Sequence, residues 1–284
     1  MHPSCRRLAI AGTYGLSMFD PLPYRSVAVA STFSPRFEQV LAEAKRIRDR
    51  FDSELCLIYV GEKTDETSAK FITALEQLAL PQNAPIHYEQ GDPATAILRA
   101  IEQNKIDLIV AGALEKEVVL HRFLGNVARR LLRESPSSVM LFTHPTREPA
   151  PLRKIVFLAE YSEHGSNSLR RALHLAAREG SQRVYVVRLI TTFDEARAKQ
   201  DGTRVETDEE AKLEHFVLDL GHTDVPIEVR FIRGNTGFAA ADFVSSVEAD
   251  LLIVPLDPAK NAGQLPSNLE WLIDVIPCNL WVIR

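Results

Sequence analysis

The chain has 284 residues, of which 45% are hydrophobic and 25% are charged, values typical of folded domains. This length predicts two domains of ordinary size. The formal net charge of −5 argues against general nucleic-acid binding, and no apolar run is long enough to span a bilayer. The three cysteines are too scattered for a metal motif or a disulfide framework, which predicts a cytoplasmic protein.

The first 25 residues do not match the pattern of a folded domain. Arg6 and Arg7 precede a short, interrupted apolar run, and no A-x-A cleavage site follows. The segment is therefore a poor match for a signal peptide. We interpret residues 1–25 as an N-terminal extension that lies against the first domain.

Residues 26–142 alternate between apolar runs and helical patterns. The strands are expected at residues 26–32, 54–60, 86–89, 106–110 and 139–142. Helices are expected to begin at Ser34-Pro35, at residue 65, at Asp92-Pro93 and at Gly125-Asn126. Nearly continuous apolar strands are typical of parallel sheets that are covered on both faces. The alternation predicts an α/β domain with a doubly wound, five-stranded parallel sheet.

The second half of the chain repeats the pattern of the first. Residues 143–152 contain three prolines and little apolar material, which indicates a linker. After the linker, KIVFLAEYS at residues 154–162 corresponds to SVAVASTFS in the first half, and Ser162 corresponds to Ser34, both expected to cap a helix. Residues 153–284 therefore form a second domain of the same kind.

One loop of the first domain has the features of a small-molecule site. Gly112 follows the fourth expected strand, and Gly125-Asn126 opens the next helix. Open α/β sheets bind ligands beyond the carboxyl ends of their strands, and helix N-termini attract anions. The alternative is that Gly112 only makes a tight turn and that Gly125-Asn126 only starts a helix.

These residues resemble the universal stress protein family, whose nucleotide-binding members carry G-x2-G-x9-G-[S/T] after the fourth strand. Gly112 and Gly125 match the first and third glycines, while Glu115 replaces the second glycine and Asn126 replaces Ser/Thr. The resemblance implies two tandem Rossmann-like domains related by a pseudo-two-fold axis. It also implies a role in the stress response.

The resemblance further implies an adenine-nucleotide site in the first domain, for ATP or AMP, with Mg only if a triphosphate is bound. In nucleotide-binding family members an Asp at the end of strand one contacts the adenosine part, the end of strand two lines the base, and the glycine loop holds the phosphates. The matching positions here are Thr32, Val60, Gly112, Gly125 and Asn126. Glu115 opposes phosphate unless it faces solvent or holds a metal ion.

The loop of the second domain is expected not to hold phosphates. Pro255, Pro258 and Pro266 stand where the family has glycines. Proline has no N–H to donate and cannot adopt the backbone angles of glycine. The second domain is therefore interpreted as degenerate.

We find no pattern of catalytic or metal-ligating residues, so the chain is expected to be a non-enzymatic regulatory protein. A nucleotide-free scaffold for protein interactions is the alternative, and slow ATP hydrolysis is a third hypothesis. The last strands, at residues 139–142 and 280–283, are apolar and uncharged, although edge strands need protection. Family dimers pair these strands antiparallel, so the resemblance implies the same pairing within this chain. A homodimer is a further hypothesis.

Overall fold

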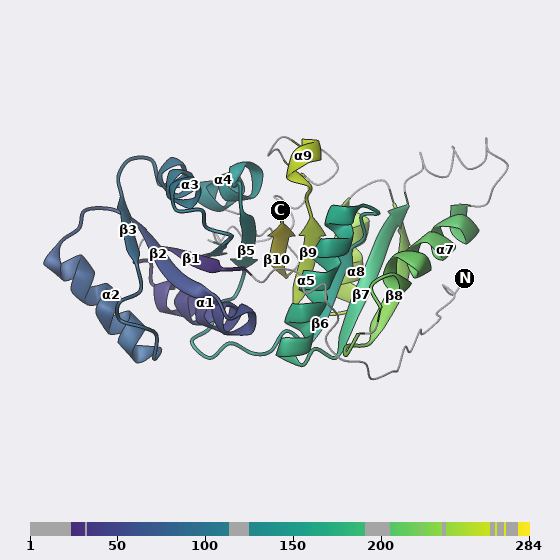
Figure 1. The fold of residues 1–284 in the computed structure, drawn as a ribbon, viewed down its shortest axis with the longest axis horizontal. Helices are drawn as coiled ribbons and strands as arrows, with labels where there is room; N and C mark the ends of the chain where they lie inside the picture. Colours follow the sequence, from purple (N-terminus) through teal and green to yellow (C-terminus); the bar gives the residue numbers. More distant parts are fainter. Residues whose placement is uncertain are drawn as a thin grey trace. The chain divides into compact units, whose positions relative to one another are not determined.

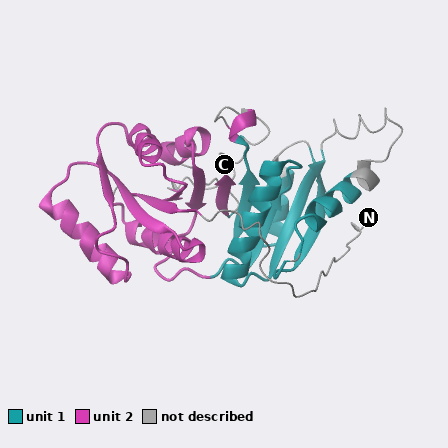
Figure 2. Cartoon of the chain, viewed as in Figure 1, with its two compact units in different colours: residues 1–22, 151–257, 267–278 teal, residues 23–150, 258–266, 279–284 magenta. Residues whose placement is uncertain are grey.

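The computed structural model describes residues 24–31, 33–113, 125–190, 205–221, 223–234, 237–261, 265, 270 and 278–284 (Figure 1). The expected N-terminal extension, apart from its last two residues, lies outside this part of the chain, as do Thr32, Glu115 and Pro266. Two compact units divide the chain (Figure 2). The N-terminal unit comprises residues 23–150, 258–266 and 279–284, and the C-terminal unit is built on residues 151–257.

The N-terminal unit contains the predicted alternation of strands and helices. Its elements are β1 (Ser26–Ser31), α1 (Phe37–Phe51), β2 (Glu54–Val60), α2 (Asp65–Gln77), β3 (Ile86–Glu89), α3 (Pro93–Gln103), β4 (Leu108–Gly112), α4 (Asn126–Glu134) and β5 (Ser138–Phe142). The five strands are parallel in the order β3-β2-β1-β4-β5, which confirms the predicted doubly wound sheet. Helices α1 and α2 cover one face and α3 and α4 the other (Figure 1).

Burial explains why these segments form a sheet. The middle of β1, β2 and β4 is fully buried, with Val29, Leu57 and Ile109 all at 0% exposure. Such strands have no polar face and are stable only between two helical layers. Helix α1 contributes the predicted apolar stripe of Val40, Leu41, Ala44, Ile47 and Phe51, all of them buried.

Of the predicted N-cap residues of α3 and α1, the structure confirms the first and contradicts the second. Asp92 caps α3 as expected, because its carboxylate accepts a hydrogen bond from the Thr95 backbone N–H at 3.0 Å. The expectation that Ser34 caps α1 is wrong. The helix begins at Phe37 with Arg36 at the N-cap position, and only the backbone carbonyl of Ser34 contributes, accepting from Phe37 N at 2.9 Å.

The edge of the sheet at β5 is covered by the last strand of the chain, β10 (Asn279–Ile283). The two strands run antiparallel with Trp281 opposite Met140, which confirms the predicted pairing. Trp281 is fully buried, with its ring 6.0 Å from that of Tyr24 and 5.7 Å from that of Phe51, measured between centroids. The described N-terminal unit thus holds a sixth, antiparallel strand that the chain supplies from its far end.

The C-terminal unit repeats the topology of the first half. Its elements are β6 (Lys154–Leu158), α5 (Glu163–Glu179), β7 (Arg183–Ile190), α7 (Val205–Leu218), β8 (Ile227–Arg233), α8 (Gly237–Ser246) and β9 (Leu251–Pro255). The short helix α9 (Pro258–Asn261) follows in the chain and is assigned to the N-terminal unit. The parallel order β9-β6-β7-β8 corresponds to β4-β1-β2-β3. Ser162 caps α5 as predicted, accepting from Gly165 N at 3.0 Å.

Candidate ligand-binding site

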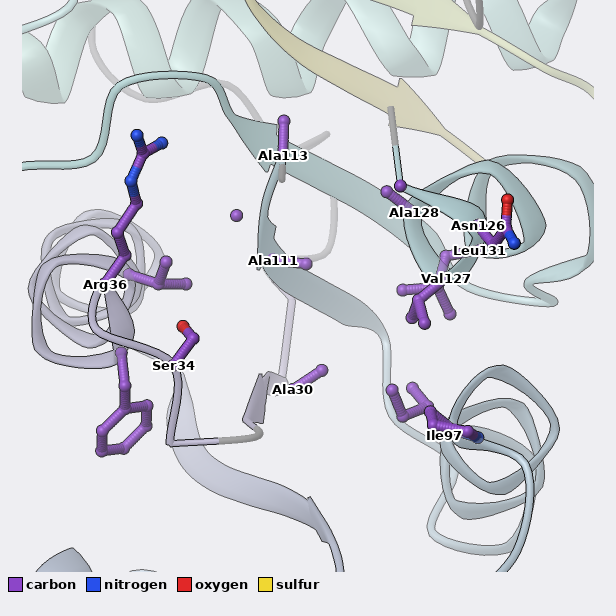
Figure 3. Close-up of a pocket in the computed structure, with 15 residues that line it drawn as sticks. Ala30, Ser34, Arg36, Ile97, Ala111, Ala113, Asn126, Val127, Ala128 and Leu131 are labelled. Carbon is purple, nitrogen blue, oxygen red and sulfur yellow. The ribbon is translucent and has the colours of Figure 1, made fainter. Parts of the chain in front are cut away.

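A cavity of about 170 Å³ lies where the strand order of the N-terminal unit reverses (Figure 3). Strands β1 and β4 are neighbours, yet the helices that follow them cover opposite faces of the sheet. The carboxyl ends of the two strands therefore border an open crevice, the usual ligand position in such sheets. The lining residues are Ala30, Ser34, Arg36, Phe37, Val40, Pro93, Ile97, Ala111, Gly112, Ala113, Gly125, Asn126, Val127, Ala128 and Leu131.

The cavity brings together three of the five residues named from the sequence. Gly112, Gly125 and Asn126 line it. Val60 ends β2 and is absent from the lining, and Thr32 lies outside the described residues. The nucleotide-binding set inferred from the resemblance is thus divided between the cavity and the end of β2.

Gly112 has a packing reason to be glycine. A Cβ atom at this position would lie 2.9 Å from Cγ2 of Val40 on α1, closer than carbon atoms approach in proteins. Helix α1 therefore packs directly against the backbone of β4. The sequence alternative was that Gly112 only makes a tight turn, whereas in the structure Gly112 is the last residue of β4 and is constrained by packing. The same close approach shapes one wall of the cavity.

At the start of α4, no described residue accepts a hydrogen bond from the first backbone N–H groups of the helix. Gly125 is the N-cap residue, with φ −63° and ψ 156°, and it has no side chain to cap the helix. The first bond within the helix runs from Arg129 N to the Gly125 carbonyl, at 3.1 Å. The N–H groups of residues 126–128 have no acceptor within the helix, and this end carries partial positive charge.

The start of α3 differs because a carboxylate already occupies it. Asp92 accepts hydrogen bonds from Thr95 Oγ1 at 2.8 Å and from Arg130 Nη1 at 2.7 Å, besides the bond from Thr95 N. Hydrogen bonds from Thr95, and then the charge of Arg130, lower the pKa of Asp92. Of the two helix starts on this face, only that of α4 is left without a side-chain cap.

Two polar residues at the cavity were not identified from the sequence. Ser34 and Arg36 lie between β1 and α1, and Figure 3 shows them on the side of the cavity opposite Asn126. Within the part of the chain that the structure describes, the Arg36 guanidinium makes no hydrogen bond or ion pair. The predicted capping role assigns the Ser34 side chain to the helix, and no sequence signal distinguishes Arg36 from other exposed arginines.

The described residues offer little other chemistry. No cluster of three or more His, Cys, Asp or Glu side chains among them is arranged to hold a metal ion. Within the same residues, no helix has the length and apolar character needed to cross a membrane. In the second half, β9 ends at Pro255 and α9 begins at Pro258, so two of the three prolines lie where the corresponding first-half loop starts.

Comparisons with known proteins agree with the architecture. The model of the universal stress protein family matches residues 62–143 and 151–284. A universal stress protein of Methanocaldococcus jannaschii is 25% identical over 145 residues, which cover 44% of this chain and 85% of that protein.

Two solved structures share the fold across both halves. A functionally unknown protein from Pseudomonas aeruginosa has a TM-score of 0.71 at 15% identity, covering 93% of each chain. A universal stress protein from Archaeoglobus fulgidus has a TM-score of 0.66 at 15% identity, covering 92% of this chain and 98% of its own.

Proposed function

Because this chain belongs to the universal stress protein family, we propose that its N-terminal unit binds an adenine nucleotide, ATP or AMP, and acts as a sensor. The observation that carries this proposal is the cavity at the β1–β4 reversal, bordered by the uncapped start of α4. An apolar interior beside unpaired N–H donors suits a ligand with a ring at one end and an anion at the other.

The phosphate end of the nucleotide belongs at the start of α4. Three backbone N–H groups and the helix dipole favour negative charge there. Arg36 adds a full positive charge on the opposite side of the cavity. A triphosphate carries more negative charge than these groups neutralise, so we expect ATP, but not AMP, to need Mg²⁺.

The site is proposed to bind without catalysing a reaction. None of the described lining residues is a carboxylate, a histidine or a cysteine, the side chains that most often act as acids, bases and nucleophiles. We propose a regulatory role in the stress response and a cytoplasmic location.

Direct binding measurements test the proposal. Titration calorimetry with AMP and with ATP plus Mg²⁺ is expected to detect binding, and mass spectrometry of the purified protein is expected to find bound nucleotide. Gly125→Asp is the informative variant, because Asp is a favourable N-cap residue and adds a negative charge at the phosphate end. Gly125→Asn is its matched, uncharged control.

The charged variant is expected to lose clearly more ATP affinity than its neutral control, and the difference is expected to shrink at high salt. Equal affinities of the two variants would place the phosphates elsewhere. A wild-type protein with neither bound nucleotide nor measurable affinity would favour the nucleotide-free scaffold instead.

A further inference from the structure

The carboxyl end of β2, next to Val60, is surrounded by aromatic side chains of the chain itself. The rings come from five different segments and are Phe33, Phe37, Tyr59, Phe71 and Tyr88. The Phe33 centroid lies 4.4 Å from that of Phe71 and 5.0 Å from that of Tyr59. These spacings are direct ring contacts. We call this group the aromatic cluster.

The backbone around the aromatic cluster adapts to it. Phe33 has φ +49°, in the left-handed region that bulky residues rarely adopt. The Tyr59 ring folds back over Gly61, where a Cβ atom would lie 2.6 Å from Tyr59 Cε1. Phe71, at the centre, is fully buried, so the cluster is continuous with the core. Phe33, Tyr59 and Tyr88 are half-buried, so the cluster also forms the surface at the end of β2.

The cavity itself draws no residue from β2. Its walls are mostly apolar and come largely from β1, α1, α3, β4 and α4, with Ile97 and Val127 facing the same space from α3 and α4 (Figure 3). Its volume of about 170 Å³ resembles that of an engineered apolar cavity of about 150 Å³ that binds benzene. A cavity of this volume is large enough to hold one planar ring.

We propose that the cavity beside β4 receives the ring of the ligand, and that the aromatic cluster closes the end of β2 to it. The placement rests on the proposed function for the identity of the nucleotide. The cavity accepts one ring of the purine, and the rest of the base lies at the mouth beside Ser34. This assignment moves the base away from Val60, where the family resemblance places it.

Filling the cavity tests the assignment. Val127→Phe adds a ring from the first turn of α4, at a half-buried helical position. Ala30→Val is a second, smaller filling variant in case the first perturbs folding. Ile72→Phe, on the exposed side of α2, is the matched control for added bulk. Thermal melts establish that each variant is folded.

Two ligands, AMP and benzene, test separately the proposed nucleotide and the proposed position of its ring in the cavity. AMP affinity by calorimetry is expected to fall at least about tenfold in Val127→Phe, equivalent to about 1.4 kcal/mol, and to stay at the wild-type value in Ile72→Phe. Benzene, followed by ligand-observed NMR, is expected to bind the wild-type protein and the Ile72→Phe control, and to be excluded from Val127→Phe.

Each outcome decides one of the two proposals. Benzene bound by wild type and lost in Val127→Phe supports the ring cavity even if AMP does not bind, in which case only the proposed nucleotide is wrong. AMP binding that survives Val127→Phe and Ala30→Val but is lost in Val60→Phe overturns the placement. Failure of the wild-type protein to bind benzene also overturns it.

Discussion

At the scale of single residues, the cavity of the N-terminal unit is shaped by the packing contact between Gly112 and Val40. Gly112 ends β4, and Val40 of α1 leaves no room for a side chain there. Val40 is almost completely buried, at 6% exposure, so it cannot turn into solvent. A glycine that looks like part of a phosphate loop in sequence is therefore also required by the packing of α1 on the sheet.

Gly112→Ala is expected to destabilise the fold by about 1–3 kcal/mol, the usual cost of forcing a group into a packed core. Urea unfolding measures the change. In the double variant with Val40→Ala, the added methyl group occupies the space that Val40 vacates, so the two losses are expected to be less than additive. Strictly additive losses would show that the two positions do not contact each other.

At the scale of elements, α3 and α4 are joined by charge at their shared face. Arg130 of α4 donates to Asp92 at the start of α3 and also pairs with Glu134, at 2.9 Å, one turn further along α4. Asp92 thus caps the start of α3 and also links α3 to α4 through the ion pair with Arg130. The two helices that frame the cavity on this face are held together at the end where the ligand is proposed to bind.

The stabilisation from Asp92 is expected to depend on pH. Its pKa is lowered in the folded protein, first by the hydrogen bonds from Thr95. The charged carboxylate therefore stabilises the fold above the pKa of the unfolded chain, about 4, and this contribution disappears as pH falls through the lower folded-state pKa. Asp92→Ala is expected to lower the thermal midpoint at pH 7. The difference in midpoint between wild type and variant is expected to become smaller as the pH falls below about 4, because the wild-type carboxylate is then protonated as well.

Circular-dichroism melts of the wild-type protein and the variant over this pH range provide the measurement. Asp92→Asn is the control, because Asn also caps helices but carries no charge. It is expected to retain the capping contribution and to lose the ion pair with Arg130. A difference between wild type and Asp92→Ala that does not change with pH would contradict the ionic contribution.

At the scale of the molecule, the last six residues complete the sheet of the N-terminal unit. Strand β10 covers β5, and Asn279 Oδ1 accepts from Thr143 N at 3.0 Å. The Arg284 guanidinium donates to the carbonyls of Leu132 and Ser137, near the end of α4. The unit that holds the candidate site therefore depends on the far end of the chain.

Deleting residues 279–284 is expected to destabilise the protein and to expose the backbone of β5. An apolar edge strand with unpaired N–H and C=O groups recruits another strand, so the truncated chain is expected to self-associate. Light scattering after size-exclusion chromatography measures the mass. The variant Trp281→Ala keeps the strand and is expected to cost about 3–5 kcal/mol without association. A truncated protein that stays stable and monomeric would contradict the proposal that residues 279–284 protect the edge of the sheet at β5.

The fold follows closely from local sequence patterns. Nearly continuous apolar runs such as residues 106–110, alternating with helical stripes, predict parallel strands between helical layers, and the strand orders confirm it. Helix starts that depend on a single capping side chain, as at Asp92 and Ser162, could also be predicted from the sequence. The reason is that the capping hydrogen bond joins residues only three positions apart. The pairing of β5 with β10 was implied by the resemblance to family dimers, because the apolar, uncharged character of both segments shows only that each edge needs a cover.

The shape of the candidate site was decided by tertiary packing. Ser34 and Arg36 border the cavity because α1 begins later than the local signal indicates. The end of β2 is surrounded by rings from residues 33, 37, 59, 71 and 88, which are neighbours only in the folded chain. A strand's own sequence specifies its burial, but the side chains that fill the space at its end come from distant segments, and only their packing decides what room is left for a ligand.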